Sequence, residues 1–170
     1  MNGMAWVRML IGATWLDGAV EKLANPHFPQ QFAATLRSGG YVAQAPPFFQ
    51  QFMRQHVIPN AELFANLTRA GELVFGVLLV LGLLTNLAAL WSIAFSGMLI
   101  VSQGGLGFGE GLAPPQFFTI DLIMALLSLF VLLSPAAKSL SVDGRLFRKS
   151  KLLAPLLTNR RAGSRRATTK

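Results

Sequence analysis

The stretch LFANLTRAGELVFGVLLVLGLLTNLAALWSIAFSGMLIVSQ, residues 63–103, decides the fold of this chain. It holds two apolar runs, 63–84 and 86–103. A helix needs roughly 20 mostly apolar residues to cross the hydrocarbon core of a bilayer, so both runs are predicted to be membrane-spanning helices. Because Thr85 and Asn86 leave almost no room for a loop, the two helices are expected to form an antiparallel hairpin.

Two further segments have the length and apolar character of spans. Residues 4–23 (MAWVRMLIGATWLDGAVEKL) are apolar at first and charged at their end, and residues 117–134 (FFTIDLIMALLSLFVLLS) stop at Pro135, which cannot continue a helix. The predicted fold class is therefore an all-α integral membrane protein. Its four-transmembrane-helix bundle is expected to form one domain over residues 1–137, followed by a basic tail over 138–170.

The composition agrees with a membrane protein. Hydrophobic residues make up 52% of the 170 residues and charged residues 13%, and the mean hydropathy is +0.48. Soluble domains carry about 25% charged residues. The chain has no cysteine, which excludes disulfides, thiolate chemistry and cysteine-ligated metals. Two histidines, His27 and His56, are too few for an imidazole-rich metal site, so no metal is expected.

The net charge of +8 is concentrated in the tail. Ten of the fifteen Lys and Arg residues lie in 138–170, where Asp143 is the only acid. Nucleic-acid binding would call for basic residues spread over a folded surface, so no nucleic-acid partner is expected. The tail is predicted to contact anionic lipids, at about 1 kcal/mol per basic residue near the surface. The excess of Lys and Arg places it in the cytoplasm, and four spans then place the N-terminus there too.

The segment between the first two spans, residues 24–62, is rich in phenylalanine. Phe48, Phe49 and Phe52 fall at helical spacing beside polar residues, which predicts a short amphipathic helix that either lies at the extracytoplasmic membrane surface or caps the bundle. Pro46 and Pro47 are expected to start this helix, and Pro59 is expected to stop it.

Six ionisable residues within the spans form the candidate polar or ligand site. Such groups are costly in a membrane and usually face the bundle interior. The predicted orientation places all six in the outer half of the bundle, within about 15 Å of that interface. The inner half is expected to be almost entirely apolar. The six residues are Asp17, Glu21, Lys22, Arg69, Glu72 and Asp121.

Two readings of this site are open. Polar pairs between transmembrane helices can act purely as packing contacts, each worth about 0.6–2 kcal/mol. The other reading is a functional site, to which the extracytoplasmic segment would add His27, Tyr41 and His56. No catalytic residue is identified by a self-sufficient motif.

Three stretches of the sequence resemble the DoxX/DoxD family of small bacterial membrane proteins. They are RMLIGATWLDGAVEKL (8–23), HVIPNAELFANLTRAGELVFGVLLVLGLLTNLAAL (56–90) and SLSVDGRL (139–146). The most specific part includes Pro59, Asn60, Glu72, Gly76 and Gly82. Asn86 stands where family members commonly carry a basic residue after GLLT.

The resemblance implies a four-helix bundle in the bacterial inner membrane and a role in a membrane oxidoreductase complex. DoxD is known as the small subunit of thiosulfate:quinone oxidoreductase. The expected function is a membrane subunit of a quinone-linked oxidoreductase, with quinone as the ligand, no covalently bound cofactor, and other membrane protein subunits as partners. The alternative is a non-catalytic accessory subunit of a larger energy-transducing membrane complex.

Overall fold

The computed structural model describes residues 3–39, 43, 45–102, 120–138 and 140–143, and no strand occurs among them. Six α-helices form the fold. They are α1 (Gly3–Ala24), α2 (Phe28–Arg37), α3 (Pro47–Phe52), α4 (Ala61–Leu81), α5 (Thr85–Ser102) and α6 (Ile120–Leu133). A π-helical turn, Met53–Val57, and a 3-10 turn, Ile58–Asn60, join α3 to α4, and a second 3-10 turn, Pro135–Lys138, follows α6.

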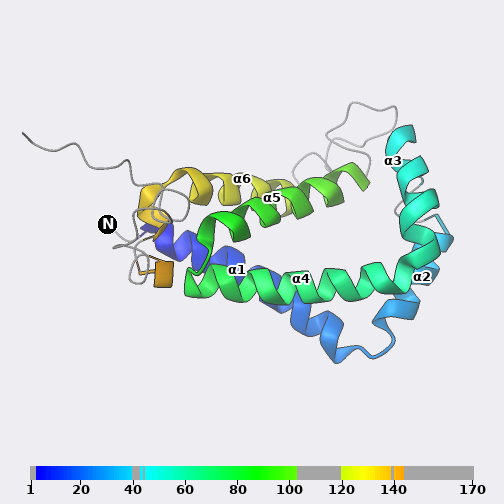
Figure 1. The fold of residues 1–170 in the computed structure, drawn as a ribbon, viewed down its shortest axis with the longest axis horizontal. Coiled ribbons are helices and arrows are strands. Elements are labelled where there is room, and N and C mark those ends of the chain that lie inside the picture. Colours follow the sequence, from blue (N-terminus) through cyan, green and yellow to red (C-terminus); the bar gives the residue numbers. More distant parts are fainter. Residues whose placement is uncertain (1–2, 40–42, 44, 103–119, 139, 144–170) are drawn as a thin grey trace, which may run out of the picture.

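Four long helices run lengthwise through the molecule, and the two shorter ones lie together at one end (Figure 1). α1 packs mainly on α4, and α5 packs mainly on α6. α1 and α4 approach each other closely at two glycines, since a Cβ on Gly12 would lie 2.8 Å from the carbonyl oxygen of Gly76. Small residues at such a crossing let two helix backbones come together, as is common in membranes.

The four helices expected from the apolar runs are present. α1 and α5 match the predicted ranges 4–23 and 86–103 within a residue or two, and α6 covers the described part of 117–134. The turn between α4 and α5 lies earlier than predicted, at Gly82–Leu84. Gly82 ends α4 in the left-handed conformation with φ 67°, so α5 already includes Thr85 and Asn86. Residues 103–119, which include the connection between the third and fourth predicted spans, and the tail beyond residue 143 lie outside the described residues.

The prediction that Pro59 ends the amphipathic helix is wrong. The helix does begin at Pro47, but the chain stays helical from Pro47 to Leu81. Proline lacks an N–H and clashes with the carbonyl four residues earlier in a regular α-helix. The π-helical and 3-10 turns around Pro59 change the hydrogen-bonding pattern at this point, so the helical path bends instead of stopping (Figure 1).

α2 was not predicted from the sequence. It begins with a proline in its first turn, which suits a helix start, and buries Ala33 and Leu36. These side chains pack with Met53, Val57 and Ala61 in a second, smaller core. The segment between α1 and α4 thus forms a folded cap on one end of the bundle, which is one of the two placements predicted for it, and it contains α2 in addition to the predicted helix.

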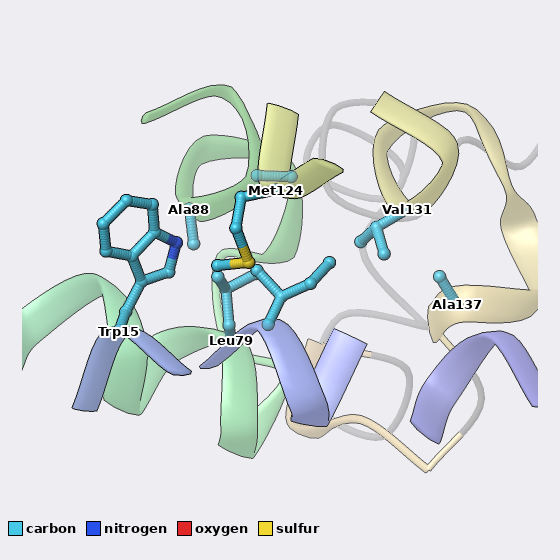
Figure 2. Packing of buried hydrophobic residues seen from close by; sticks show 8 residues of the cluster. Trp15, Leu79, Ala88, Met124, Val131 and Ala137 are labelled. Atoms are coloured by element: carbon cyan, nitrogen blue, oxygen red, sulfur yellow. The ribbon is translucent and has the colours of Figure 1, made fainter. Parts of the chain in front are cut away.

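The main core lies between α1, α4, α5 and α6. Its buried apolar side chains come from all four helices and from the turn after α6, and six of them are labelled in Figure 2: Trp15, Leu79, Ala88, Met124, Val131 and Ala137. Several are alanines, which bring α5 close to its neighbours.

The bundle buries several polar side chains beside its apolar core and exposes many large apolar ones. The wholly buried side chains in the helices include Arg8, Thr85, Ser92, Ser96 and Ser128, whereas large apolar side chains such as Leu10 (65% exposed) and Phe130 (60%) face outward. A water-soluble monomer rarely leaves so much apolar surface open. Two helices, Pro47–Leu81 and Thr85–Ser102, are long and apolar enough to cross a membrane, and α6 is a shorter apolar helix. α1 is less apolar because it carries four ionisable residues.

Candidate functional site

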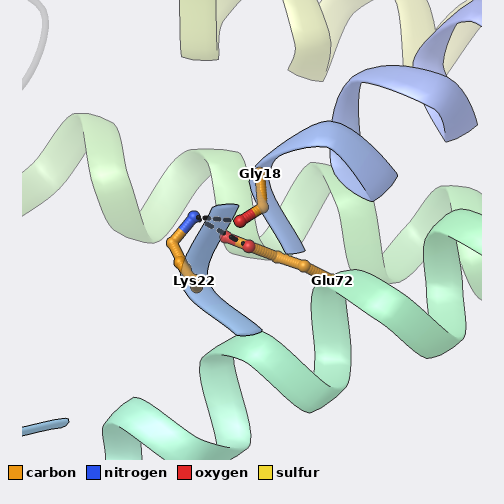
Figure 3. Close-up of polar contacts among 3 residues, drawn as sticks. All are labelled: Gly18, Lys22 and Glu72. Atoms are coloured by element: carbon orange, nitrogen blue, oxygen red, sulfur yellow. Dashed lines mark hydrogen bonds and ion pairs between the residues drawn. The ribbon is translucent and has the colours of Figure 1, made fainter. Parts of the chain in front are cut away.

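Lys22 and Glu72 form an ion pair between α1 and α4 (Figure 3). The Nζ atom of Lys22 lies 2.8 Å from Oε2 of Glu72 and also donates to the carbonyl oxygen of Gly18 at 3.2 Å. The Glu72 side chain is 5% exposed and the Lys22 side chain 25%. The carboxylate of the pair is therefore buried, and the side chain that carries the ammonium group is partly exposed.

Local sequence explains how the pair fits between the helices. Gly18 lies one turn before Lys22, and a Cβ there would lie 3.2 Å from Lys22 Nζ and 3.4 Å from Glu72 Oε2. Glycine at this position leaves the room into which the lysine side chain folds back. Glu72 lies one turn before Gly76, on the buried face of α4.

The other predicted site residues do not join this pair by a hydrogen bond or an ion pair among the described residues. Glu21 is close enough for its charge to be felt at Glu72, but its side chain is exposed. Asp17 is exposed on the outward side of α1, and Arg69 is half-buried on α4. Asp121 is half-buried in the first turn of α6 and has a polar or electrostatic contact of its own.

A chain of hydrogen bonds at the middle of the bundle was missed from the sequence. The indole Nε1 of Trp15 donates to Oγ of Ser92 at 2.8 Å, and this oxygen lies 2.8 Å from Oγ of Ser128. The chain links α1, α5 and α6, and both serines are wholly buried. The spacing of Ser92 and the buried Ser96 on one face of α5 is a signal that a helical projection of the sequence could have found.

The prediction of an almost entirely apolar inner half is also wrong. Arg8 and Asp143 are both wholly buried and lie beside Gly82, at the C-terminal end of α4, whereas α3 is joined to the other end of this helix. The two carboxylate oxygens of Asp143 accept hydrogen bonds, each of 2.8 Å, from the backbone N–H groups of Leu84 and Thr85. The Asp143 N–H donates in turn to the carbonyl oxygen of Gly82 at 3.0 Å. This carboxylate caps α5 from a distant part of the chain, where negative charge suits a helix N-terminus.

Arg8 completes this end of the bundle. Its Nη2 donates to the carbonyl oxygen of Leu140 at 3.2 Å, whereas Nε and Nη1 make no hydrogen bond to any residue that the structure describes. The guanidinium occupies the space where a Cβ on Gly82 would stand. Its charge interacts with that of Asp143. Arg8, Gly82 and residues 140–143 therefore hold three segments of the chain together.

The remaining residues named from the sequence do not build a metal site. His27 and His56 are exposed on the cap, and Tyr41 lies outside the described residues. Within the part of the chain that the structure describes, no group of three or more His, Cys, Asp or Glu side chains is placed to hold a metal ion.

Comparison with known proteins identifies the family. No curated protein and no solved structure matches the chain. The family model described as DoxX matches residues 3–105, which include α1 to α5, the Lys22–Glu72 pair and Trp15 with Ser92. Since this match covers more than half of the 170 residues, the chain belongs to the DoxX family of membrane proteins.

Proposed function

We propose that this chain is a membrane subunit of a quinone-linked oxidoreductase complex and that Lys22 and Glu72 form its quinone-facing polar site. The observation that carries the proposal is the 2.8 Å ion pair, whose carboxylate is buried and whose ammonium is partly exposed. An ionisable pair inside a membrane bundle is expensive to bury and is commonly kept for function. Family membership supports a membrane setting for it.

The pair has the free hydrogen-bonding capacity that a quinone headgroup needs. Lys22 has three N–H donors, and two of them are used, on Gly18 and Glu72. The third can donate to a carbonyl oxygen that approaches from the exposed side. Oε1 of Glu72 makes no hydrogen bond among the described residues, so an acceptor for a hydroxyl is present beside the donor.

Each residue has a definite task in this proposal. Lys22 Nζ holds a proton toward an incoming carbonyl oxygen, and Glu72 keeps the ammonium charged and in position. The buried neighbours of Glu72 on α1 and α4 exclude bulk water from the carboxylate. A bound quinone would supply the two-electron acceptor, and the electrons would come from another subunit of the complex.

The proposed placement in the membrane follows from charge. The basic tail and the N-terminus lie on the cytoplasmic side of a bacterial inner membrane, with four spans between them, and the cap of α2 and α3 lies outside. A reporter fused after Lys170 is expected to read as cytoplasmic. A periplasmic signal would contradict this orientation.

A second candidate is a non-catalytic accessory subunit. The contact that favours it is the same ion pair, because a bonded lysine and glutamate on two tightly packed helices also serve as helix–helix packing contacts. In that case the two residues would affect assembly and stability only.

The deciding experiment measures quinone reduction by the intact complex with Glu72→Gln and with Lys22→Gln, alongside the yield of assembled complex. Glu62→Gln is the matched control, because Glu62 is on the same helix but exposed. We expect both site variants to assemble normally and to lose at least tenfold in kcat/KM, and the control to keep its activity. Lost assembly, or unchanged turnover in both site variants, would support the accessory subunit instead.

A further inference from the structure

α1 has an outward face that differs from the lipid-facing surfaces of the other helices. Leu10, Ala13, Thr14, Asp17 and Glu21 are all exposed and follow one another at helical spacing; we name them the Asp17 face. The exposed positions of α6, by comparison, are apolar: Ile120, Ile123, Leu126, Leu129, Phe130 and Leu133. Among the described bundle helices, the Asp17 face alone combines small exposed residues with two exposed acids.

Contacts with neighbouring helices place Asp17 deep along the bundle axis. A Cβ on Gly12 would meet Gly76, and a Cβ on Gly18 would meet Glu72, so Asp17 lies alongside the part of α4 between these two residues. Trp15, which bonds to Ser92 near the midpoint of α5, is only two residues away, or about 3 Å along the axis. Asp17 is thus level with the middle of helices that are long and apolar enough to cross a membrane.

No described residue balances the charge on this face by a hydrogen bond or an ion pair. Among the described residues Asp17 and Glu21 make no hydrogen bond or ion pair, and the nearby Lys22 is bonded to Glu72. Like charges four residues apart on a helix repel each other. Thr14, in contrast, satisfies its own hydroxyl by donating to the carbonyl oxygen of Leu10 at 3.0 Å. A positively charged group would therefore bind favourably at the Asp17 face.

We propose that the Asp17 face docks a transmembrane helix of a partner subunit, and that this helix carries a Lys or Arg opposite Asp17. Ala13 and Thr14 leave a shallow surface against which a second helix can lie closely. A basic side chain at this depth would neutralise Asp17 and be neutralised by it. A second copy of this chain is a poor occupant, because a symmetric contact would set Asp17 against Asp17.

The inference rests on the proposed membership of a membrane complex but not on the quinone chemistry. The Asp17 face and the Lys22–Glu72 pair lie on different sides of α1, so variants of one leave the other in place. Failure of Glu72→Gln to change quinone reduction would overturn the quinone site and leave the docking face standing.

The test is site-specific photocrosslinking in membranes of the native host. A photoreactive residue at position 13 is compared with one at position 126, which is exposed on α6. We expect an adduct from position 13 with one membrane protein, through a peptide that carries a Lys or Arg within an apolar segment. Asp17→Asn is expected to lower the adduct at least tenfold and Asp17→Glu to keep it. Reversing both charges, with Asp17→Lys here and the basic residue changed to Asp in the partner, is expected to restore it.

Other results would overturn the proposal. These are the absence of an adduct, an adduct with lipid or with a second copy of the chain, and an adduct that Asp17→Asn leaves unchanged. The amount of each variant in the membrane serves as the folding control. Because Asp17 makes no bond to the rest of its own chain among the described residues, Asp17→Asn is expected to accumulate normally.

Discussion

The two ends of the bundle each bury a basic side chain of α1 near a carboxylate, but the two arrangements differ. At the capped end Lys22 meets Glu72 directly at 2.8 Å, and the lysine side chain is 25% exposed. At the other end Arg8 and Asp143 are wholly buried. Asp143 bonds to backbone N–H groups of Leu84 and Thr85, while Arg8 bonds to the carbonyl of Leu140.

The Lys22–Glu72 pair is a contact between two helices, whereas the Arg8–Asp143 end connects three segments of the chain. The Lys22–Glu72 pair joins α1 to α4, and one of the three N–H donors of Lys22 makes no hydrogen bond among the described residues. The Arg8–Asp143 end joins α1, the α4–α5 turn and residues 140–143, and both carboxylate oxygens are used. We therefore expect changes at the Arg8–Asp143 end to affect mainly stability, and changes at the Lys22–Glu72 end to affect mainly function.

The largest expected effect is that of Asp143→Ala. It removes two hydrogen bonds to the start of α5 and leaves the buried Arg8 without its nearest negative charge. We expect the free energy of unfolding to fall by about 3–5 kcal/mol, as when one member of a buried charged pair is lost. The free energy of unfolding is measured by unfolding the protein in mixed micelles with an increasing fraction of SDS. A decrease of less than about 1 kcal/mol in the free energy of unfolding would contradict the proposed stabilising role of this end of the bundle.

Gly82→Ala is expected to be the next most damaging change. Gly82 has φ 67°, and an added Cβ would take the space of the Arg8 guanidinium. The left-handed conformation costs about 1–2 kcal/mol for other residues and overpacking about 1–3 kcal/mol, so a loss of about 2–5 kcal/mol is expected in the same assay.

Gly97→Ala is the matched control for Gly82→Ala. An added Cβ at Gly97, within α5, would meet nothing within 4 Å. Since alanine is the better helix former by about 1 kcal/mol, this variant is expected to be neutral or slightly more stable. Equal losses at both glycines would show that the guanidinium contact is not the cause.

The smallest expected effect on stability comes from the Lys22–Glu72 pair. A double-mutant cycle with Lys22→Met and Glu72→Gln is expected to give a coupling energy of about 0.5–2 kcal/mol. The partly exposed lysine and the modest size of interhelical polar contacts both limit this value. A coupling energy as large as the decrease in the free energy of unfolding caused by Asp143→Ala would show that the two ends contribute equally to stability.

The sequence predicts the long helices well because each rests on a local apolar run. It does not predict where those helices bend or turn, because these depend on geometry. Pro59 is tolerated by a change of hydrogen-bonding pattern, and Gly82 ends α4 three residues before the expected loop. α2 was missed because its helix is short, with only 10 residues.

The candidate site was predictable only in part. Burial of Glu72 follows from its place in an apolar helix, but polar residues lie on opposite sides of α1, so the sequence does not decide whether Asp17 or Lys22 turns inward. The bond from Asp143 to the N–H of Leu84 spans 59 residues. No local pattern in the sequence shows which backbone groups such a carboxylate will find.

That long separation has a consequence for the order in which the chain is made. α5 leaves the ribosome well before residue 143 exists, since synthesis proceeds from the N-terminus at about 5–20 residues per second. Until then the first turn of α5 lacks its carboxylate cap, and Arg8 lacks both Leu140 and Asp143. Residues 140–143, which are synthesised last among the described residues, thus hold α1, which is synthesised first. The bundle can therefore reach its final packing only after α6 has been synthesised.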